Sequence, residues 1–155
     1  MGFFDKFKNA NSWNNKGIKL EEQCKFIEAL DCFNKSLEKD PENDITWINK
    51  GNILAKLGKD YEAIESFDKA LLLDPNNSIA WYNKGNSYSN LEDYEKALES
   101  YNKALKLNPK DDSVWYNEGN SYLKLGINQE AISSYNEALE LDPKKLKHGI
   151  IKVLF

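Results

Sequence analysis

Few side chains in this 155-residue sequence could carry out catalysis or hold a metal ion. The thiols are Cys24 and Cys32, and the one imidazole is His148. We expect both cysteines in one helix, where a separation of eight residues puts their Cα atoms about 12 Å apart, too far for a disulfide bond. The sequence has no Cys-x-x-Cys spacing, which is the pattern that would indicate a metal site. His148 stands in a lysine-rich tail without an evident partner, so we expect no metal and no cofactor.

The acidic residues do not suggest a catalytic pair. Glu21–Glu22 and Asp111–Asp112 are expected at helix ends or on exposed faces, where a solvated charge is the ordinary interpretation. All 21 basic residues are lysine, and the net charge is −4. Without arginine the chain lacks the planar donor group that suits phosphates and base edges. We therefore predict that the chain is not an enzyme and does not bind nucleic acid.

Nothing in the sequence predicts a membrane partner. The longest apolar stretches, such as residues 71–73, are far shorter than the roughly 20 residues of a membrane-spanning helix. Charges interrupt residues 1–8 too early for a secretory signal, and Lys6 stands where a myristoylation motif has Ser or Thr. We expect a cytoplasmic protein.

One polar residue recurs in a regular pattern. Asparagines stand three residues apart in three places, at an interval of 34 residues: Asn49 and Asn52, Asn83 and Asn86, and Asn117 and Asn120. Asparagine is unfavourable inside helices because its side chain competes for backbone hydrogen bonds, so this recurrence needs an explanation.

The elements that position these asparagines follow the same interval. Trp13, Trp47, Trp81 and Trp115 are 34 residues apart, and so are the glycines and prolines that follow them: Gly17, Gly51, Gly85, Gly119, Pro41, Pro75, Pro109 and Pro143. Each unit holds two apolar stripes of helical spacing separated by a break, which predicts a helical hairpin. The glycines allow two helices to approach closely beside an aromatic ring, and the prolines end the second helix.

This pattern of Trp, Gly, Tyr, Ala, Phe, Ala and Pro resembles the tetratricopeptide repeat. The resemblance covers residues 10–143, with repeats 10–43, 44–77, 78–111 and 112–145 after a short N-terminal segment, 1–9. It implies an all-α fold, a right-handed superhelical solenoid of antiparallel helix pairs. In this family the first helix of each pair lines a concave groove.

The resemblance also implies which residues line that groove. We predict a peptide-binding surface of carboxamides with apolar and aromatic neighbours: Asn49, Asn52, Asn83, Asn86, Asn117, Asn120, Ile48, Tyr82 and Tyr116, flanked by Ile45 and Ile79. Each carboxamide offers a donor and an acceptor for the backbone of an extended ligand. The alternative is that the asparagines make local or inter-repeat hydrogen bonds, and the sequence leaves both interpretations open.

The predicted function is a protein-interaction scaffold that holds a partner peptide or helix. The family's clamp for C-terminal carboxylates is not expected, because Asn14, Ile48 and Tyr82 stand where its first lysine belongs. Two alternatives stay open: a module that self-assembles into a homo-oligomer through its terminal segments, and the targeting domain of a larger protein.

Some positions depart from the family's pattern. Lys16, Lys50, Lys84 and Glu118 replace an apolar residue, and we expect their stems on apolar surface with the charge in water. Residues 146–155 have helical spacing and are interpreted as a capping helix or the start of a continuation. Phe3, Phe4 and Phe7 are expected to pack on repeat one.

Overall fold

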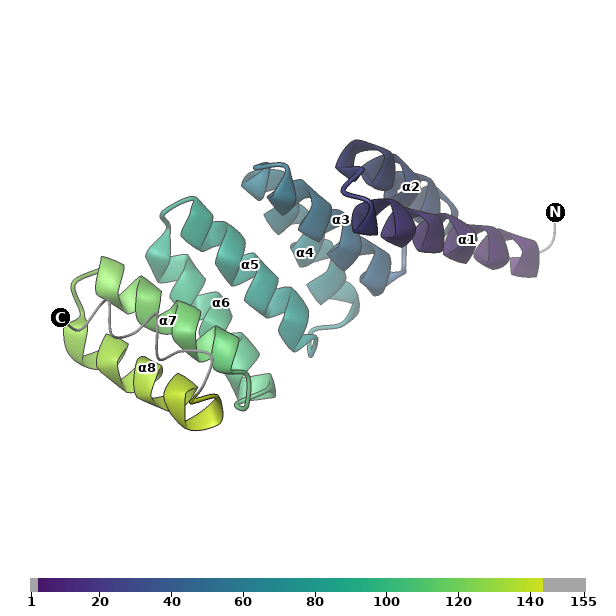
Figure 1. Ribbon diagram of the computed structural model, residues 1–155. Helices are drawn as coiled ribbons and strands as arrows, with labels where there is room; N and C mark the ends of the chain where they lie inside the picture. The colour runs from purple at the N-terminus through teal and green to yellow at the C-terminus, as the bar shows by residue number, and fades with distance from the viewer. Residues whose placement is uncertain (1–2, 144–155) are drawn as a thin grey trace. The chain divides into compact units, whose positions relative to one another are not determined.

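The computed structural model describes residues 3–143, and their side chains from residue 9 onward. Within that range the chain is all helix, as the sequence predicted: α1 (Phe3–Glu22), α2 (Phe26–Lys39), α3 (Asp44–Lys56), α4 (Asp60–Leu73), α5 (Ser78–Asn90), α6 (Tyr94–Leu107), α7 (Asp112–Lys124) and α8 (Asn128–Leu141) (Figure 1). The chain divides into two compact units, unit 1 (Met1–Asn76) and unit 2 (Asn77–Phe155). Each unit contains two hairpins of consecutive helices, and the second helix of the first hairpin packs on the next hairpin.

A side-chain cap fixes the start of α3, α5 and α7, the first helices of three hairpins. The side-chain oxygen of Asn43 accepts a hydrogen bond from the Thr46 amide at 2.9 Å, and Asn77 accepts one from the Ala80 amide at 3.0 Å. Asp111 caps α7 in the same way. These caps satisfy backbone N–H groups that have no partner inside the helix. The periodic prolines lie two residues earlier, where they prevent the preceding helix from continuing.

The periodic tryptophans are tied to the periodic prolines. Trp47 Nε1 donates to the Pro41 carbonyl at 2.8 Å, and Trp115 Nε1 donates to the Pro109 carbonyl at 2.9 Å. An indole N–H in a packed setting needs such an acceptor. The bond therefore joins the first helix of a hairpin to the loop that leads into it.

Within each hairpin, a glycine of the first helix lies against an aromatic ring of the second. A Cβ atom added at Gly85 would lie 2.5 Å from Cε1 of Tyr101, and one at Gly51 would lie 2.5 Å from Cε1 of Phe67. Gly17 and Gly119 meet Phe33 and Tyr135 in the same way. The four rings are at most 1% exposed. The glycines thus permit the close helix approach that the sequence predicted.

The turn inside each hairpin contains a residue in the left-handed conformation. It is Gly58 (φ 72°) and Gly126 (φ 76°) in two hairpins, but Cys24 (φ 58°) and Glu92 (φ 60°) in the other two. The expectation that Cys24 and Cys32 share a helix is therefore wrong, because Cys24 lies in the turn and Cys32 in α2. The chain reverses direction here, and both thiols are free.

The hairpins stack through apolar side chains of their second helices. In unit 1, Ala29 and Phe33 of α2 pack with Ile53 of α3. In unit 2, Tyr101 and Leu105 of α6 pack with Val114 of α7. Full burial of one such large side chain contributes about 1.5–3 kcal/mol.

In repeat one, Ser36 of the α1–α2 hairpin stands where the later repeats have alanine, at Ala70, Ala104 and Ala138. It is buried and donates its hydroxyl to the Ala10 carbonyl at 2.9 Å. The substitution of serine for alanine at this periodic place therefore adds a hydrogen bond between α1 and α2.

Candidate functional site

In unit 2, the first helices α5 and α7 are joined by a network of amides and phenols. Asn117 Nδ2 donates to Tyr82 Oη and to Asn86 Oδ1, both at 3.0 Å. Asn86 Oδ1 also accepts from the Tyr101 hydroxyl at 2.8 Å. Three helices, α5, α6 and α7, therefore meet at one carboxamide oxygen.

The fourth repeat contains the same kind of pair. The Tyr135 hydroxyl of α8 donates to Asn120 Oδ1 of α7 at 2.8 Å. The Tyr116 ring lies 5.7 Å from the Tyr135 ring between centroids, and the Tyr82 and Tyr101 rings are 6.1 Å apart. Burial raises the pKa of Tyr135 to about 12 and raises that of Tyr101 further, so both phenols stay protonated at neutral pH.

Unit 1 is organised differently at the corresponding places. Asn49 Nδ2 donates to Asn14 Oδ1 at 3.1 Å, and the Thr46 hydroxyl lies within hydrogen-bond distance of both Asn43 Oδ1 (2.9 Å) and Asn14 Oδ1 (3.2 Å). Lys56 and Glu21 form an ion pair at 2.7 Å between α3 and α1. Polar side chains of α1 and α3 thus bond to each other, by hydrogen bonds and an ion pair, on the surface that these two helices share.

The predicted surface residues are therefore not equivalent. Tyr82, Asn86, Tyr116, Asn117 and Asn120 lie together in unit 2, half-buried. Asn49 is bonded within unit 1, and Asn52 and Asn83 are engaged as well. Ile48 is only 7% exposed and offers little contact area, whereas Ile45 and Ile79 are more than half exposed. Local or inter-repeat hydrogen bonds, the alternative interpretation of the asparagines, are present at Asn49, Asn86, Asn117 and Asn120.

The lysines that replace an apolar residue lie over the periodic tryptophans. The ammonium groups of Lys16, Lys50 and Lys84 are each 5.1 Å from the indole centroid three residues earlier. Such cation–π contacts stabilise by about 0.5–1 kcal/mol at exposed sites. Burial lowers the pKa of Lys50.

Glu118 does not keep its charge in water, so the expectation for this position is wrong. Its side chain is 4% exposed, and its Oε2 accepts from the Ser134 hydroxyl at 2.7 Å. Burial raises the pKa of the carboxyl group. A carboxylate cannot form the cation–π contact that the lysines make with the tryptophans, and the Glu118 side chain bonds to α8 instead.

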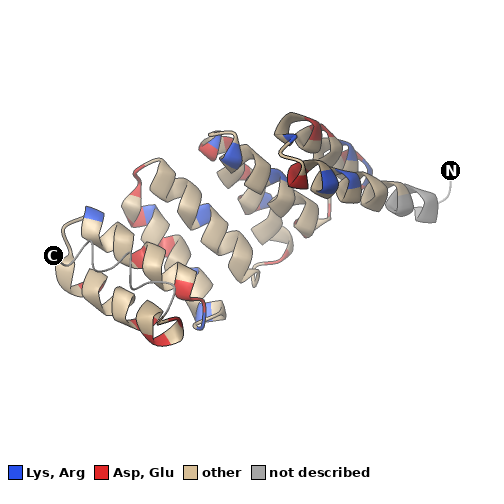
Figure 2. Cartoon of the chain, viewed as in Figure 1, with Lys and Arg blue, Asp and Glu red and all other residues tan. Residues whose placement is uncertain are grey.

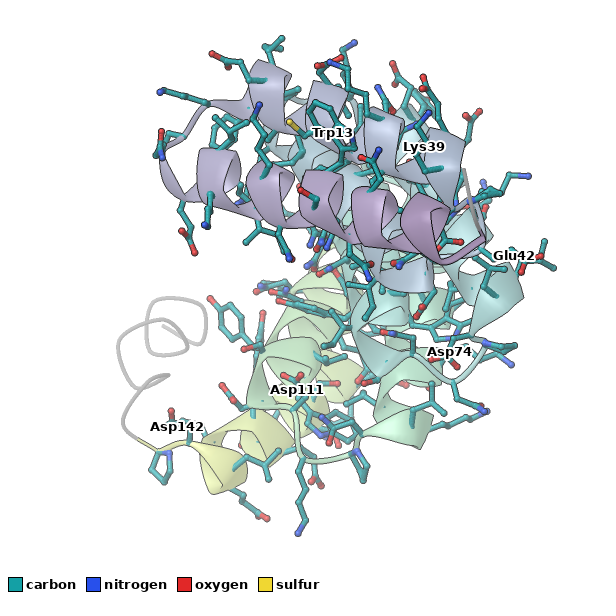
Figure 3. The ribbon with its side chains drawn as sticks, turned by 90° about the vertical axis from the view of Figure 1, so that its right-hand side faces the viewer. Trp13, Lys39, Glu42, Asp74, Asp111 and Asp142 are labelled. Carbon is teal, nitrogen blue, oxygen red and sulfur yellow. The ribbon has the colours of Figure 1, made fainter. Side chains whose placement is uncertain are left out.

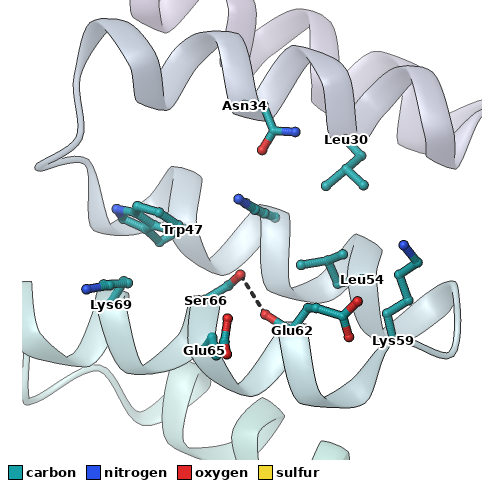
Figure 4. Close-up of a pocket in the computed structure, with 10 residues that line it drawn as sticks. Leu30, Asn34, Trp47, Leu54, Lys59, Glu62, Glu65, Ser66 and Lys69 are labelled. Atoms are coloured by element: carbon teal, nitrogen blue, oxygen red, sulfur yellow. Dashed lines mark hydrogen bonds between the residues drawn. The ribbon is translucent and has the colours of Figure 1, made fainter.

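Sequence reasoning missed a pocket in unit 1, between α2, α3 and α4 (Figure 4). It has a volume of about 390 Å³ and an apolar base of Leu30, Trp47 and Leu54. Lys50 and Glu62 line it with further charges of both signs. The spacing of Trp47 and Lys50 recurs in the sequence and could have indicated it. Because its lining residues come from α2 of the first hairpin and from α3 and α4 of the second, the pocket is a crevice between two stacked hairpins.

The charged side chains that the structure describes are spread over the helices (Figure 2). Lysines and acids are interspersed along the helices of each unit (Figure 2). The aspartates labelled in Figure 3, Asp74, Asp111 and Asp142, lie at helix ends. Across residues 3–143, no group of three or more His, Cys, Asp or Glu side chains could hold a metal ion. Among the described helices, none has the length and apolar character that a membrane span requires.

Helical hairpins with a 34-residue period and a glycine–aromatic contact in each define a class of helical repeat proteins. The family model of the tetratricopeptide repeat matches residues 10–43, 45–77, 78–111 and 113–145, so the chain belongs to the tetratricopeptide-repeat family. This model describes a repeat and indicates no catalytic chemistry. No curated protein matches the sequence of the chain.

Solved structures share the fold. A crystal structure of MamA has a TM-score of 0.84 at 22% identity, covering 90% of this chain and 81% of that chain. YrrB, described as a tetratricopeptide protein with an unusual peptide-binding site, has a TM-score of 0.82 at 22% identity, covering 93% and 74%. The first tetratricopeptide domain of Spaghetti (RPAP3), bound to an HSP90 peptide, has a TM-score of 0.76 at 25% identity, covering 77% and 94%.

Proposed function

We propose that the chain is a cytoplasmic protein-interaction scaffold that holds an extended segment of a partner protein against the first helices of its hairpins. The observation that carries this proposal is the cluster of Tyr82, Asn86, Tyr116 and Asn120 on α5 and α7. Aromatic rings provide contact area at a low entropic cost, and carboxamides pair with peptide groups of any sequence. Membership of the family supports the proposal, as do two similar structures described as peptide-binding.

The surface in unit 2 is the part of the predicted groove that we favour for binding. The ladder of six asparagines extends over both units, and its continuity between them stays a prediction. Asn117 uses both amide hydrogens in internal bonds, and Asn49 uses one, so they have less to offer a ligand than the sequence suggested. Tyr82 and Tyr116 become the main candidates for contact.

A display selection with random peptides on the full chain would supply a probe. Titration of the selected peptide should show binding that weakens at least about tenfold in Tyr82→Ala and in Tyr116→Ala. Tyr61→Ala is the matched control, because Tyr61 is 70% exposed on α4, outside this surface. Equal binding by wild type and both tyrosine variants would refute the proposed surface.

Self-assembly through the terminal segments stays the alternative function. Residues 146–155 and the side chains of Phe3, Phe4 and Phe7 lie outside the described part, although α1 itself begins at Phe3. Sedimentation velocity over a range of concentrations separates the two functions. A monomer at all concentrations argues against self-assembly, whereas reversible association would favour it.

A further inference from the structure

The amide of Asn86 is held in one orientation by its neighbours. A carboxamide oxygen has two lone pairs, and both are used at Asn86, by the Tyr101 hydroxyl and by Asn117 Nδ2. The amide nitrogen, with its two hydrogens, donates to none of the residues that the structure describes. Asn86 is half-buried on α5. Its amide nitrogen is therefore the polar group of this side chain that can bond to a ligand.

Asn120 makes the same bond to a tyrosine hydroxyl one repeat further along the chain. Its oxygen accepts from the Tyr135 hydroxyl at the same distance, 2.8 Å. The phenol is 1% exposed and keeps its proton at neutral pH because burial raises its pKa. In this bond the hydroxyl donates and the amide oxygen of Asn120 accepts, so the oxygen faces Tyr135.

This pairing is confined to unit 2 for a reason visible in the sequence. The aromatic ring beside the periodic glycine is phenylalanine in unit 1, at Phe33 and Phe67, and a phenylalanine has no hydroxyl to orient an amide. In unit 2 the corresponding rings are Tyr101 and Tyr135, which pack in the same way and add a donor.

We propose that Asn86 and Asn120 are oriented hydrogen-bond donors that select a partner segment by its acceptors, the backbone carbonyl oxygens of an extended peptide. This inference rests on the proposed function and adds that the surface offers hydrogen-bond donors to the partner. Tyr82 adds a third donor, because its oxygen accepts from Asn117 while its own hydrogen is left to donate.

The spacing of the donors sets the spacing of the acceptors. Neighbouring packed helices are about 10 Å apart, and an extended chain advances about 3.3 Å per residue. The two amides should therefore contact carbonyl groups about three residues apart. Asn117 has a different part: both hydrogens of its amide tie α7 to α5, so it is a positioning residue that keeps the donors in register.

The test uses the display-selected peptide described above, titrated against the full chain. Asn86→Asp and Asn120→Asp each keep an oxygen that accepts from the tyrosine hydroxyl but remove the donor. Each should weaken binding about tenfold or more while leaving the unfolding midpoint near that of wild type. Asn102→Asp, an exposed position on α6, is the control for the added charge.

A thioamide scan of the peptide provides the second half of the test. Sulfur is a weaker acceptor than oxygen, so substitution at two positions about three residues apart should weaken binding to wild type but not to the matching aspartate variant. Should an aspartate variant fail to fold, the side-chain amide signals of Asn86 and Asn120 in wild type replace it. These signals should shift when the peptide is added.

The outcomes are distinct. Unchanged or tighter binding by both aspartate variants, or amide signals that do not respond, would overturn the donor assignment, since an amide turned the other way presents an acceptor. If Tyr116→Ala still weakens binding in that case, the proposed function stands and only the inference fails. If no tyrosine or asparagine variant affects binding, the proposed function fails with it.

Discussion

The contact between Gly85 and Tyr101 predicts that alanine is destabilising at a helical position. In the Gly85→Ala variant, the new Cβ would lie 2.5 Å from Cε1 and 2.7 Å from Cδ1 of the ring. Carbon atoms pack at about 3.5 Å or more, so the ring must move by roughly 1 Å. The ring is 1% exposed, and its hydroxyl is bonded to Asn86 at 2.8 Å, so movement also strains that bond.

The magnitude follows from three terms. Overpacking a tight core costs about 1–3 kcal/mol, and loss of the hydroxyl bond costs about 1 kcal/mol. The better helix preference of alanine offsets about 1 kcal/mol. We therefore expect a net loss of about 1–3 kcal/mol in the free energy of unfolding. Urea unfolding followed by far-UV circular dichroism measures it, with Ser133→Ala, an exposed position on α8, as the control.

A double variant sharpens this prediction. Tyr101→Leu makes space beside the new methyl group, so the cost of Gly85→Ala should be smaller in that background than in wild type. A coupling free energy of about 1 kcal/mol or more is expected for residues in direct contact. Additive effects, or a Gly85→Ala variant as stable as wild type, would refute the close-contact explanation.

Three further predictions concern the turn, the buried acid and the ligand. Glu92→Gly should stabilise the chain by about 0.5–1 kcal/mol, since left-handed backbone is strained for residues other than glycine. Gly126→Ala should destabilise the chain, because the backbone is left-handed there although no atom would contact the new Cβ. Urea unfolding curves of Glu92→Gly and Gly126→Ala that match the wild-type curve would contradict these two expectations. Glu118→Gln should be more stable than wild type at neutral pH, because burial raises the pKa of the carboxyl group in the folded state. Its advantage should grow as the pH rises above the ordinary glutamate pKa and disappear below it, and a difference independent of pH in thermal melts would contradict the explanation. Peptides with acidic, chaperone-type C-terminal tails should bind weakly in calorimetry, with salt removing any attraction to the lysines. Micromolar, salt-resistant binding that needs a free carboxylate would show that a clamp exists.

The repeat and its hairpins were accessible to sequence analysis because small and large residues recur at fixed intervals. Gly85 and Tyr101 are 16 residues apart in the sequence and in direct contact in the structure, as the interpretation of the glycine required. The break inside the hairpin was less accessible. Cys24 and Glu92 occupy a left-handed position that glycine fills in the other two hairpins, and nothing in their residue types indicates it.

Glu118 shows why the environment of a charged residue was harder to predict. The ammonium groups of the lysines at the corresponding places lie over an indole ring, which attracts a cation. A carboxylate at the same place loses that attraction and finds a hydroxyl on α8, Ser134. The partner is 16 residues away, and the same serine is present in repeats whose neighbour is a lysine, so the sequence alone gives no sign of the pair.

The asparagines could not be resolved from the sequence because the same residue type serves two roles. Asn117 uses both amide hydrogens within the fold, whereas Asn86 uses both lone pairs and keeps its hydrogens. The orientation of Asn86 depends on a residue outside the predicted surface, Tyr101, whose hydroxyl is missing from its counterpart Phe67. A core position that appears purely structural therefore determines the polarity of a surface residue one helix away. Specificity in such an array can change through the buried ring as well as through the residues that meet the partner.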